Sequence, residues 1–478
     1  DLEQIVQGSC YFNPNATGGT GGVNFYHITD IFTDNIQCNG VGTSSDQYVY
    51  ENMDAMFTWD INMFRTDGDG DKPQFYNKPY VGIGACNVIL DYLDQMEGDR
   101  DLREYLRGEV LALRAWYYFH LVNFFGLPYN STIGSPEENP GVPLQLTSSV
   151  VEAPASRNTV KEVYDQILGD LTRGFQLMSE HYFDKGIYRL SPKSAAAMLS
   201  RVYLCLEDWD KAIAYADTVL SYQSGLLDLN TEELPDLATS LDAPVTVYNP
   251  SEPTEILWVR EYSPTTIYTK PNSGDAVTPW SVSDELSASL FEGYTATQVA
   301  TSPGATTTDL RAYFYFQWTR MNNGTYYLVF PDKPMNRAGA ENGRTHGIRT
   351  AEVYLNRAEA YIRKAIEGGN DASFVQKALD DLNLLRSHRY MNYTPLDVQD
   401  ASQLLDICLT ERRKELVGEM NNRWFDIRRC GITYSHTKFA HVGEEVTVDL
   451  KPGMYALPIP QAAMDRNSEL IQNVIYYY

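Results

Sequence analysis

The stretch SPKSAAAMLSRVYLCLEDWDKAIAYADTVL, residues 191–220, contains two apolar segments on either side of a short acidic turn. Ser191 followed by Pro192 is typical of a helix start, because proline is tolerated at the first helical position. Small side chains lie on both segments, including Ala195 on the first and Ala212 on the second, and they allow two antiparallel helices to pack closely. The stretch therefore predicts a helical hairpin of the tetratricopeptide (TPR) type.

Helical periodicity recurs along the chain. Apolar residues repeat at helical spacing over residues 101–125, where Gly126 and Pro128 mark the end, and a second helix follows Asn158 or Thr159 up to residue 178. Further pairs are predicted at 350–366 with 373–388, and at 401–417 with 423–428. The fold class is therefore mainly α: a TPR-like scaffold of helical hairpins, which wind into a right-handed α superhelix.

Residues 223–345 differ from the rest in composition. They are rich in Thr, Ser, Pro, Gly, Tyr and Trp, with short β-prone runs at 256–259 and 326–330. The segment is too long to be a simple loop. We therefore predict a loop-rich, irregular inserted subdomain that binds ligand. Residues 1–75 form a loop-rich N-terminal segment that contributes to the binding face. Residues 76–222 and 346–478 form the two halves of the scaffold, the second with a C-terminal tail.

Charge and composition exclude several classes of protein. The 478 residues include 38 Lys and Arg and 63 Asp and Glu, which gives a formal net charge of −25. Non-specific nucleic-acid binders need a basic face, so this class is excluded. The sequence has no apolar stretch long enough to span a membrane. The six cysteines lack CxxC or metal-finger spacing, and we expect most of them to be free and buried.

Catalytic and metal-binding motifs are absent from the sequence, so we expect no enzyme and no cofactor. None of the seven histidines stands in a HExxH motif, and no GxSxG, P-loop or GxGxxG motif occurs. The run DGDGD places Asp67, Asp69 and Asp71 where a calcium loop carries its first ligands. Lys72 and Lys78 then replace the glycine and the bidentate glutamate, which favours an acidic surface turn and leaves calcium as a side hypothesis.

Two basic runs, ERRKEL at 411–416 and RWFDIRR at 423–429, could indicate an anion site in an acidic protein. Acidic residues are interleaved with the basic ones at spacings of three and four. This pattern favours ion pairs within and between helices.

Aromatic residues make up 12% of the chain. Many of them lie in the loop-rich regions, where neighbours such as Thr278 and Ser281 are polar. An aromatic ring can pack on the face of a sugar ring, and planar polar side chains can hydrogen-bond its hydroxyls. We therefore predict five stacking platforms and two polar partners, Arg65 and Asp67, for a glycan. The predicted ligand-binding residues are Trp59, Arg65, Asp67, Phe75, Tyr76, Trp280 and Tyr294.

Several longer segments together resemble one family. They include EVLALRAWYYFHLVNFFGLP (109–128), RNTVKEVYDQILGDL (157–171), RTAEVYLNRAEAY (349–361), ERRKELVGE (411–419) with RWFDIRR, and LPIPQAAMDRNSELIQN (457–473). Their order and sequence resemble the SusD/RagB family, the surface glycan-binding lipoproteins of Bacteroidota. Met420, Cys430 and Ser468 depart from the usual family residues, at scaffold positions.

The resemblance implies a non-catalytic protein on the extracellular face of the outer membrane. It would be held by an N-terminal lipid anchor that is not present in this chain, and it would pass its glycan to a SusC-like TonB-dependent transporter. It carries over no ligand residues. Three alternatives stay open: a RagB-like component of a peptide-uptake complex, a scaffold that binds a partner protein, and a glycoside hydrolase.

Overall fold

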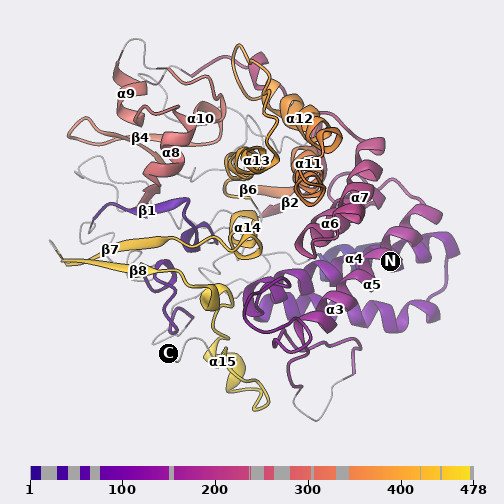
Figure 1. Ribbon diagram of the computed structural model, residues 1–478. Coiled ribbons are helices and arrows are strands. Elements are labelled where there is room, and N and C mark those ends of the chain that lie inside the picture. Colours follow the sequence, from indigo (N-terminus) through magenta and orange to yellow (C-terminus); the bar gives the residue numbers. More distant parts are fainter. Residues whose placement is uncertain are drawn as a thin grey trace.

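The helices lie side by side in one row that fills one half of the molecule in the computed structural model (Figure 1). The structure describes residues 2–11, 29–40, 54–64, 76–149, 155–235, 237, 252–262, 280–302, 306–329, 344–419, 421–441 and 444–473. The row consists of α3 (Asn77–Tyr92), α4 (Arg100–Phe125), α5 (Val160–Glu180), α6 (Pro192–Cys205), α7 (Trp209–Tyr222), α11 (Thr350–Glu367), α12 (Ala372–Ser387) and α13 (Ala401–Glu415). Neighbouring helices of this row contact one another, with α11 touching both α12 and α13. The predicted TPR-like, mainly α fold is confirmed.

Local sequence determines where these helices begin. The Thr159 side chain accepts from the Glu162 backbone N–H, and the Glu162 carboxylate accepts from the Thr159 N–H, which forms a capping box. Ser191 caps α6 in the same way with Ser194, and Pro192 occupies the first turn. These are the helix starts that the sequence predicts.

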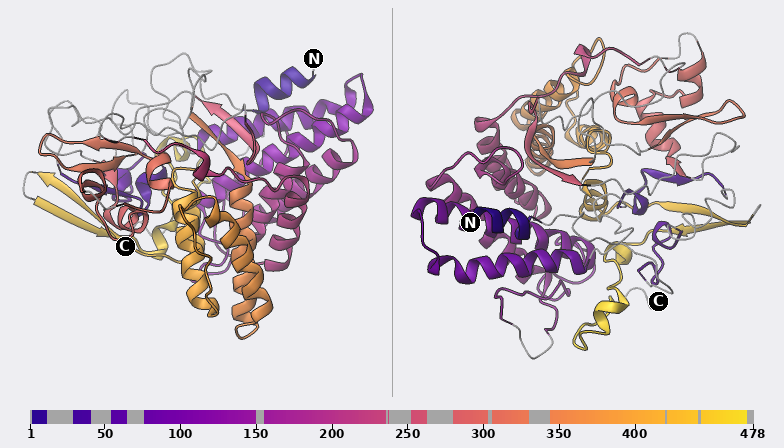
Figure 2. Two further views of the ribbon diagram at one scale, coloured as in Figure 1. Left: turned by 90° about the horizontal axis from the view of Figure 1, so that it is seen from above. Right: turned by 180° about the vertical axis from the view of Figure 1, so that it is seen from behind.

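The row is continuous although the chain leaves it in the middle. α7 ends at Tyr222 and α11 begins at Thr350, yet the two helices pack against each other. The residues between them are therefore an insertion into one scaffold, whose two halves meet directly. The two views in Figure 2 show the helices together on one side and the strands on the other.

Among the described residues, the other half is built from four two-stranded antiparallel sheets and short helices. β1 (Ile36–Cys38) pairs with β3 (Trp280–Val282), β2 (Ile256–Tyr262) with β6 (Arg344–Arg349), β4 (Gln317–Arg320) with β5 (Tyr326–Val329), and β7 (Ser435–His441) with β8 (Glu444–Asp449). The helices here are α8 (Asp284–Leu290), α9 (Ala296–Thr301) and α10 (Arg311–Phe314). We call this part the loop-rich half.

Three distant stretches of chain build the loop-rich half. In the β1–β3 pair, Ile36 lies opposite Val282 and Cys38 opposite Trp280, and β1 also contacts β7. The β7–β8 hairpin thus lies with the insertion and the N-terminal segment (Figure 1), whereas the sequence placed residues 346–478 in the scaffold and a tail. The β7–β8 hairpin follows the last helices of the chain after only a few residues. Its sequence has no periodic pattern that would predict which part of the molecule it packs against.

The remaining elements connect the two halves or lie near the chain ends. They are α1 (Leu2–Ile5), the π-helix η1 (Val6–Cys10), the 3-10 turns η2 (Thr29–Phe32), η3 (Leu93–Gln95), η4 (Leu229–Thr231) and η5 (Pro452–Tyr455), and the helices α14 (Asn422–Cys430) and α15 (Gln461–Met464). One large apolar core extends from the helices into the loop-rich half, and a smaller one fills the space between α11, α12 and α13.

Candidate functional site

The structure separates the seven predicted ligand-binding residues into three groups. Arg65, Asp67 and Phe75 lie outside the described residues, as do Asp69 and Asp71 of the calcium hypothesis. Trp59, Tyr76 and Trp280 are buried, and Tyr294 is 40% exposed. Of the predicted residues that the structure describes, Tyr294 alone offers an aromatic ring to solvent.

Trp59 and Trp280 belong to the core, which corrects their prediction as stacking platforms. The ring of His436 is stacked between Phe57 and Trp59, with centroids 3.8 Å and 4.5 Å away. The Trp59 indole N–H donates to the Phe32 carbonyl at 3.1 Å, and Trp280 packs against Phe57. Trp59 is 1% exposed and Trp280 is 6% exposed, so neither ring has a face that a sugar could reach.

Tyr76 is also a packing residue, and its prediction as a stacking platform is corrected too. It directly precedes α3, and its ring lies edge-on to Phe125 at 5.1 Å and close to Tyr80. Burial raises the pKa of Tyr76 to about 12. Trp59, Tyr76 and Trp280 were thus wrongly predicted as exposed. They lie in short, aperiodic segments, whose sequence does not indicate which side chains face the core.

Tyr294 stands on a tightly held turn between α8 and α9. Glu292 and Gly293 take positive φ angles of 54° and 95°, which reverse the chain after α8. The Thr308 hydroxyl donates to the Glu292 carboxylate at 2.6 Å, and the Tyr294 N–H donates to the Phe291 carbonyl at 3.0 Å. The ring is therefore exposed on a fixed backbone, which lowers the entropy that a ligand would otherwise lose on binding.

A second aromatic residue lies beside α9, on the β4–β5 hairpin. Tyr326 is half-buried, and its backbone N–H donates to the Thr297 hydroxyl of α9 at 2.9 Å. Arg320 is directly opposite Tyr326 in the sheet register, so the two side chains share one face of the hairpin. Arg320 is exposed, and among the described residues it has neither a hydrogen bond nor an ion pair.

We call Tyr294, Arg320 and Tyr326 the α9 face, because Tyr294 lies just before this short helix and the other two lie on the hairpin whose strand β5 contacts it. The hairpin turn adds the exposed amides of Asn322 and Asn323. An exposed ring, a planar guanidinium and amides are the groups that pack on a pyranose and bind its hydroxyls. Sequence reasoning missed Arg320, although its place opposite a tyrosine in a hairpin with an Asn-Asn-Gly turn could have been predicted.

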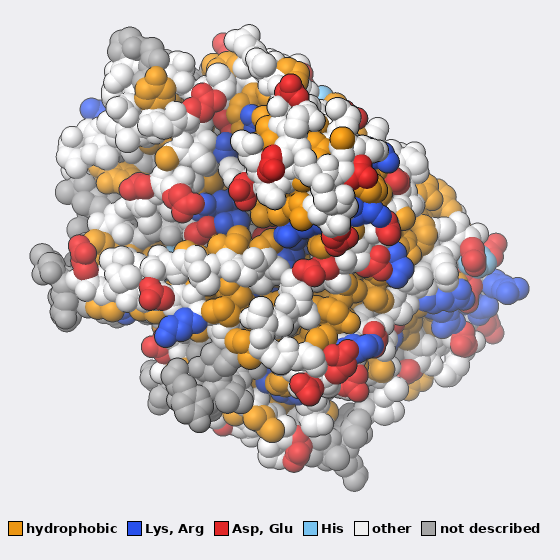
Figure 3. Space-filling model, in the orientation of Figure 1, with side chains coloured by type: hydrophobic (Ala, Val, Ile, Leu, Met, Phe, Trp, Pro, Cys, Tyr) orange, Lys and Arg blue, Asp and Glu red, His pale blue; other side chains and the backbone are white. Residues whose placement is uncertain are grey.

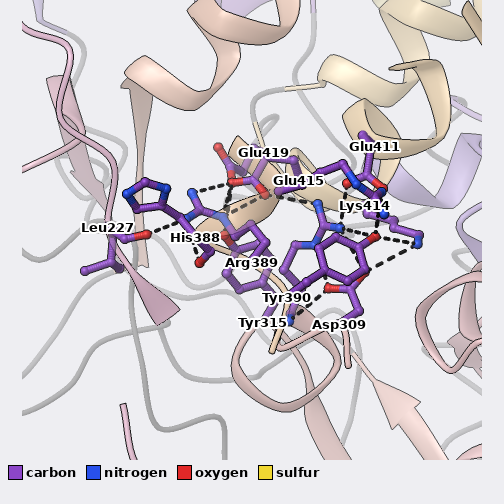
Figure 4. A network of polar contacts seen from close by, with 12 residues as sticks. Leu227, Asp309, Tyr315, His388, Arg389, Tyr390, Glu411, Lys414, Glu415 and Glu419 are labelled. Atoms are coloured by element: carbon purple, nitrogen blue, oxygen red, sulfur yellow. Dashed lines mark hydrogen bonds and ion pairs between the residues drawn. The ribbon is translucent and has the colours of Figure 1, made fainter. Parts of the chain in front are cut away.

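A buried ionic network fastens the loop-rich half to the helices (Figure 4). It joins five carboxylates and five cationic side chains through a continuous set of ion pairs. Its members are Glu255, Asp309, Arg311, Arg349, Arg386, Arg389, Glu411, Lys414, Glu415 and Glu419. The first four come from the insertion and its return strand, and the others from α12, α13 and the turns that follow these helices.

Glu415 is the centre of this network. Its carboxylate accepts from Arg349 at 2.6 Å, from Arg389 at 2.9 Å and from Arg311 at 3.2 Å, and also from the Tyr315 hydroxyl at 3.0 Å. All these guanidinium groups are fully buried. Burial alone would raise the pKa of Glu415, but the three arginines outweigh it and hold the pKa well below its usual value.

The two basic runs are structural, as the interleaved acids predict. Arg412 donates to Asp426 at 2.8 Å, and Arg429 pairs with Glu359 at 2.6 Å, so α13 and α14 are joined to each other and to α11. Arg413 donates to the Asn35 side chain at 2.9 Å, which ties α13 to the N-terminal segment. These side chains are buried and paired, so they offer no anion site.

The described residues contain no group of three or more His, Cys, Asp or Glu side chains that could hold a metal ion. No described helix has both the length and the hydropathy needed to cross a membrane. Four of the six cysteines are buried, and two, Cys38 and Cys430, are half-buried. On the face shown in Figure 3, acidic and basic side chains are interspersed.

Known proteins resemble the chain over most of its length. Residues 24–204 match the family described as "Starch-binding associating with outer membrane", and residues 290–478 match the SusD family. SusD-like protein P2 of Formosa agariphila is 25% identical over 441 residues, which cover 87% of this chain and 82% of the relative.

Solved structures share the fold. A SusD-like carbohydrate binding protein from Bacteroides vulgatus superposes with a TM-score of 0.67 at 18% identity, covering 98% of this chain and 96% of the other. Surface glycan-binding protein A from Bacteroides uniformis gives a TM-score of 0.68 at 19% identity, covering 100% of this chain and 99% of the other. Similarity at this level of identity concerns the fold alone.

Proposed function

Since the chain belongs to the SusD/RagB family, we propose that it is a non-catalytic binding protein of the outer-membrane surface. It captures an oligo- or polysaccharide and delivers it to a SusC-like TonB-dependent transporter. An N-terminal lipid anchor, as the family implies, holds it on the extracellular face. The family supplies the class of ligand and the location, and the described residues supply the candidate contacts.

The α9 face is the observation that carries this proposal. Tyr294 provides an exposed ring on a fixed turn, and Arg320 and Tyr326 lie together on the adjacent hairpin. A shallow, partly wet site of this kind binds with a Kd of about µM to mM. Arg65, Asp67 and Phe75 remain predicted contacts from the part of the chain outside the described residues.

Three buried acids are held in their ionised state by arginines, whereas burial raises the pKa of another, Asp30, to about 6. The arginines beside Glu411, Glu415 and Glu359 lower the pKa of each carboxyl, that of Glu359 to about 2. A glycosidase needs one carboxylic acid that stays protonated near neutral pH, so these acids do not suit that role. Incubation with polysaccharides should release no reducing ends.

Binding experiments with matched variants test the α9 face. We expect Tyr294→Ala and Tyr326→Ala each to weaken binding of the recognised glycan by about 1 kcal/mol, or about fivefold, because each removes one aromatic packing surface. Tyr294→Phe keeps the ring and should bind almost as wild type. Affinity electrophoresis in polysaccharide-containing gels, followed by calorimetry with oligosaccharides, measures these effects.

The control is Tyr182→Ala, which removes an even more exposed tyrosine (61%) from the turn after α5 in the helical half. It should leave binding unchanged. If the double variant Tyr294→Ala and Tyr326→Ala binds a glycan as tightly as wild type does, the α9 face is not the binding site.

A second candidate ligand is a basic oligopeptide, as in RagB-like peptide uptake, and the net charge of −25 favours it. Peptide binding that weakens steeply as salt rises, together with no response to any glycan in the same screen, would support this candidate. Glycan binding that is insensitive to salt would exclude it.

A further inference from the structure

The π-helix η1, near the start of the chain, packs against α3 of the helical scaffold, and each of these two elements carries a buried cysteine. Cys10 ends the π-helix η1, Cys86 lies in α3, and these two elements are in contact. Both residues are 0% exposed and belong to the large apolar core. Burial, and after it the Cys10 thiol, raise the pKa of the Cys86 thiol, so the two thiols interact in a dry site.

Neighbouring contacts hold this pair in place from the α4 side. The Tyr117 hydroxyl donates to the Cys10 carbonyl at 2.6 Å. The same tyrosine ring lies over Gly82, where an added Cβ would come within 2.5 Å of a ring atom. Gly82 is one helical turn before Cys86, so Tyr117, which touches both Gly82 and the Cys10 carbonyl, lies over the same face of α3 as Cys86.

The residue after Cys10 is fixed as well. The Tyr11 hydroxyl donates to the buried Glu109 carboxylate and accepts from the Leu190 N–H at 2.6 Å. Arg189 pairs with Glu109 and lies over the Tyr11 ring, 5.5 Å from its centroid. The backbone at Cys10 and directly after it is therefore held by contacts that do not involve either thiol.

We propose that Cys10 and Cys86 are a disulfide-forming pair whose oxidation ties the start of the chain to the scaffold. The thiolate of one cysteine attacks the disulfide of a thiol oxidant and releases one of its thiols. The thiolate of the other cysteine then attacks the mixed disulfide and releases the second. The protein loses two electrons and two protons, and the oxidant disulfide is reduced to two thiols.

The surroundings determine when the bond forms. Burial raises the pKa of Cys86 well above its usual value, so the folded dithiol holds little thiolate and reacts slowly. Oxidation therefore takes place while η1 is still open, during folding in an oxidising compartment, and packing then shields the finished bond. This timing in the cell rests on the proposed surface location, because disulfides persist outside the cytosol.

The test compares full-length protein exported to an oxidising bacterial periplasm with protein made in the cytosol. Both are unfolded in guanidinium with N-ethylmaleimide and no reductant, and intact mass counts the labelled cysteines. We expect six labels on the cytosolic protein and four on the exported one. Proteolysis of the exported protein should give one linked pair, the peptides that carry Cys10 and Cys86.

Variants identify the partners. Exported Cys86→Ser should carry five labels, because Cys10 loses its partner, whereas Cys38→Ser, a half-buried control, should carry three. Six labels on exported wild type, or a linked pair between any other cysteines, would overturn the proposal. The peptide map of wild type decides this even if Cys86→Ser fails to fold, and no part of the test depends on glycan binding.

Discussion

Substitution of Glu415 by glutamine tests how much the buried ionic network contributes to stability. Glutamine has nearly the same shape but no charge, so it leaves five cations against four carboxylates in a region where the three arginine partners of Glu415 are fully buried. Loss of one partner from a buried ion pair costs about 3–5 kcal/mol, because the remaining charge stays desolvated and unpaired. We expect a decrease of this size in the free energy of unfolding.

Urea unfolding followed by tryptophan fluorescence measures this change, because Trp258 and Trp424 are fully buried. The matched control is Glu285→Gln. Glu285 also pairs with an arginine, Arg413, at 2.9 Å, but its side chain is 76% exposed. Exposed pairs contribute about 0–1 kcal/mol, so this variant should stay close to wild type.

Charge balance gives a further check. Arg311→Met combined with Glu415→Gln leaves four cations against four carboxylates, so the double variant should lose less stability than the two single losses added together. The reasoning is refuted if Glu415→Gln destabilises no more than Glu285→Gln. In that case water reaches the network, or the arginines rearrange without cost.

Two further predictions concern packing and pH. Gly82→Ala should destabilise the protein by about 1–3 kcal/mol in the same urea assay, because its Cβ would lie 2.5 Å from a Tyr117 ring atom. The same change at Gly84, where nothing lies within 4 Å, should stabilise α3 by up to about 1 kcal/mol, and equal effects at both sites would contradict this account. Burial lowers the pKa of His120 to about 3 and of His436 to about 4 from the usual 6.5, so both are neutral in the fold while the unfolded chain takes up protons. Their stabilising effect is complete above pH 6.5 and falls as the pH decreases toward 4; His436 alone should cost about 2 kcal/mol at pH 5. Urea midpoints from pH 7.5 to 4.5 should fall less steeply in His436→Gln, and parallel curves would exclude His436 as a source.

Long periodic segments and caps could be predicted from the sequence. Ser191 with Pro192 marks the start of α6, and Thr159 with Glu162 marks the start of α5. The ion pairs of Arg412 and Arg429 were predictable as well, because their acids lie at helical spacing or on a neighbouring helix, whereas Arg428 donates to the Asn123 side chain and to backbone carbonyls.

The candidate site was harder to predict for a physical reason. Trp280 lies in a strand of three residues, all buried, so its alternation is too short to indicate a face. Its burial depends on pairing with Cys38, far away in the sequence, and on Phe57 from another segment. Tyr294, predicted as an exposed aromatic of the loop-rich insertion, is 40% exposed and follows the Glu-Gly turn that ends α8.

β1 pairs with β3 and contacts β7. These contacts determine the order in which the parts of a newly made chain can fold. Synthesis runs from the N-terminus, so β1 must wait for residues 280–282 and then for residues 435–441. The helical row can close neighbour by neighbour, but the loop-rich half is complete only when nearly the whole chain has emerged. A chain cut short after α13 would therefore carry a finished scaffold with an incomplete loop-rich half, and would leave unpaired strand edges for chaperones and proteases to detect.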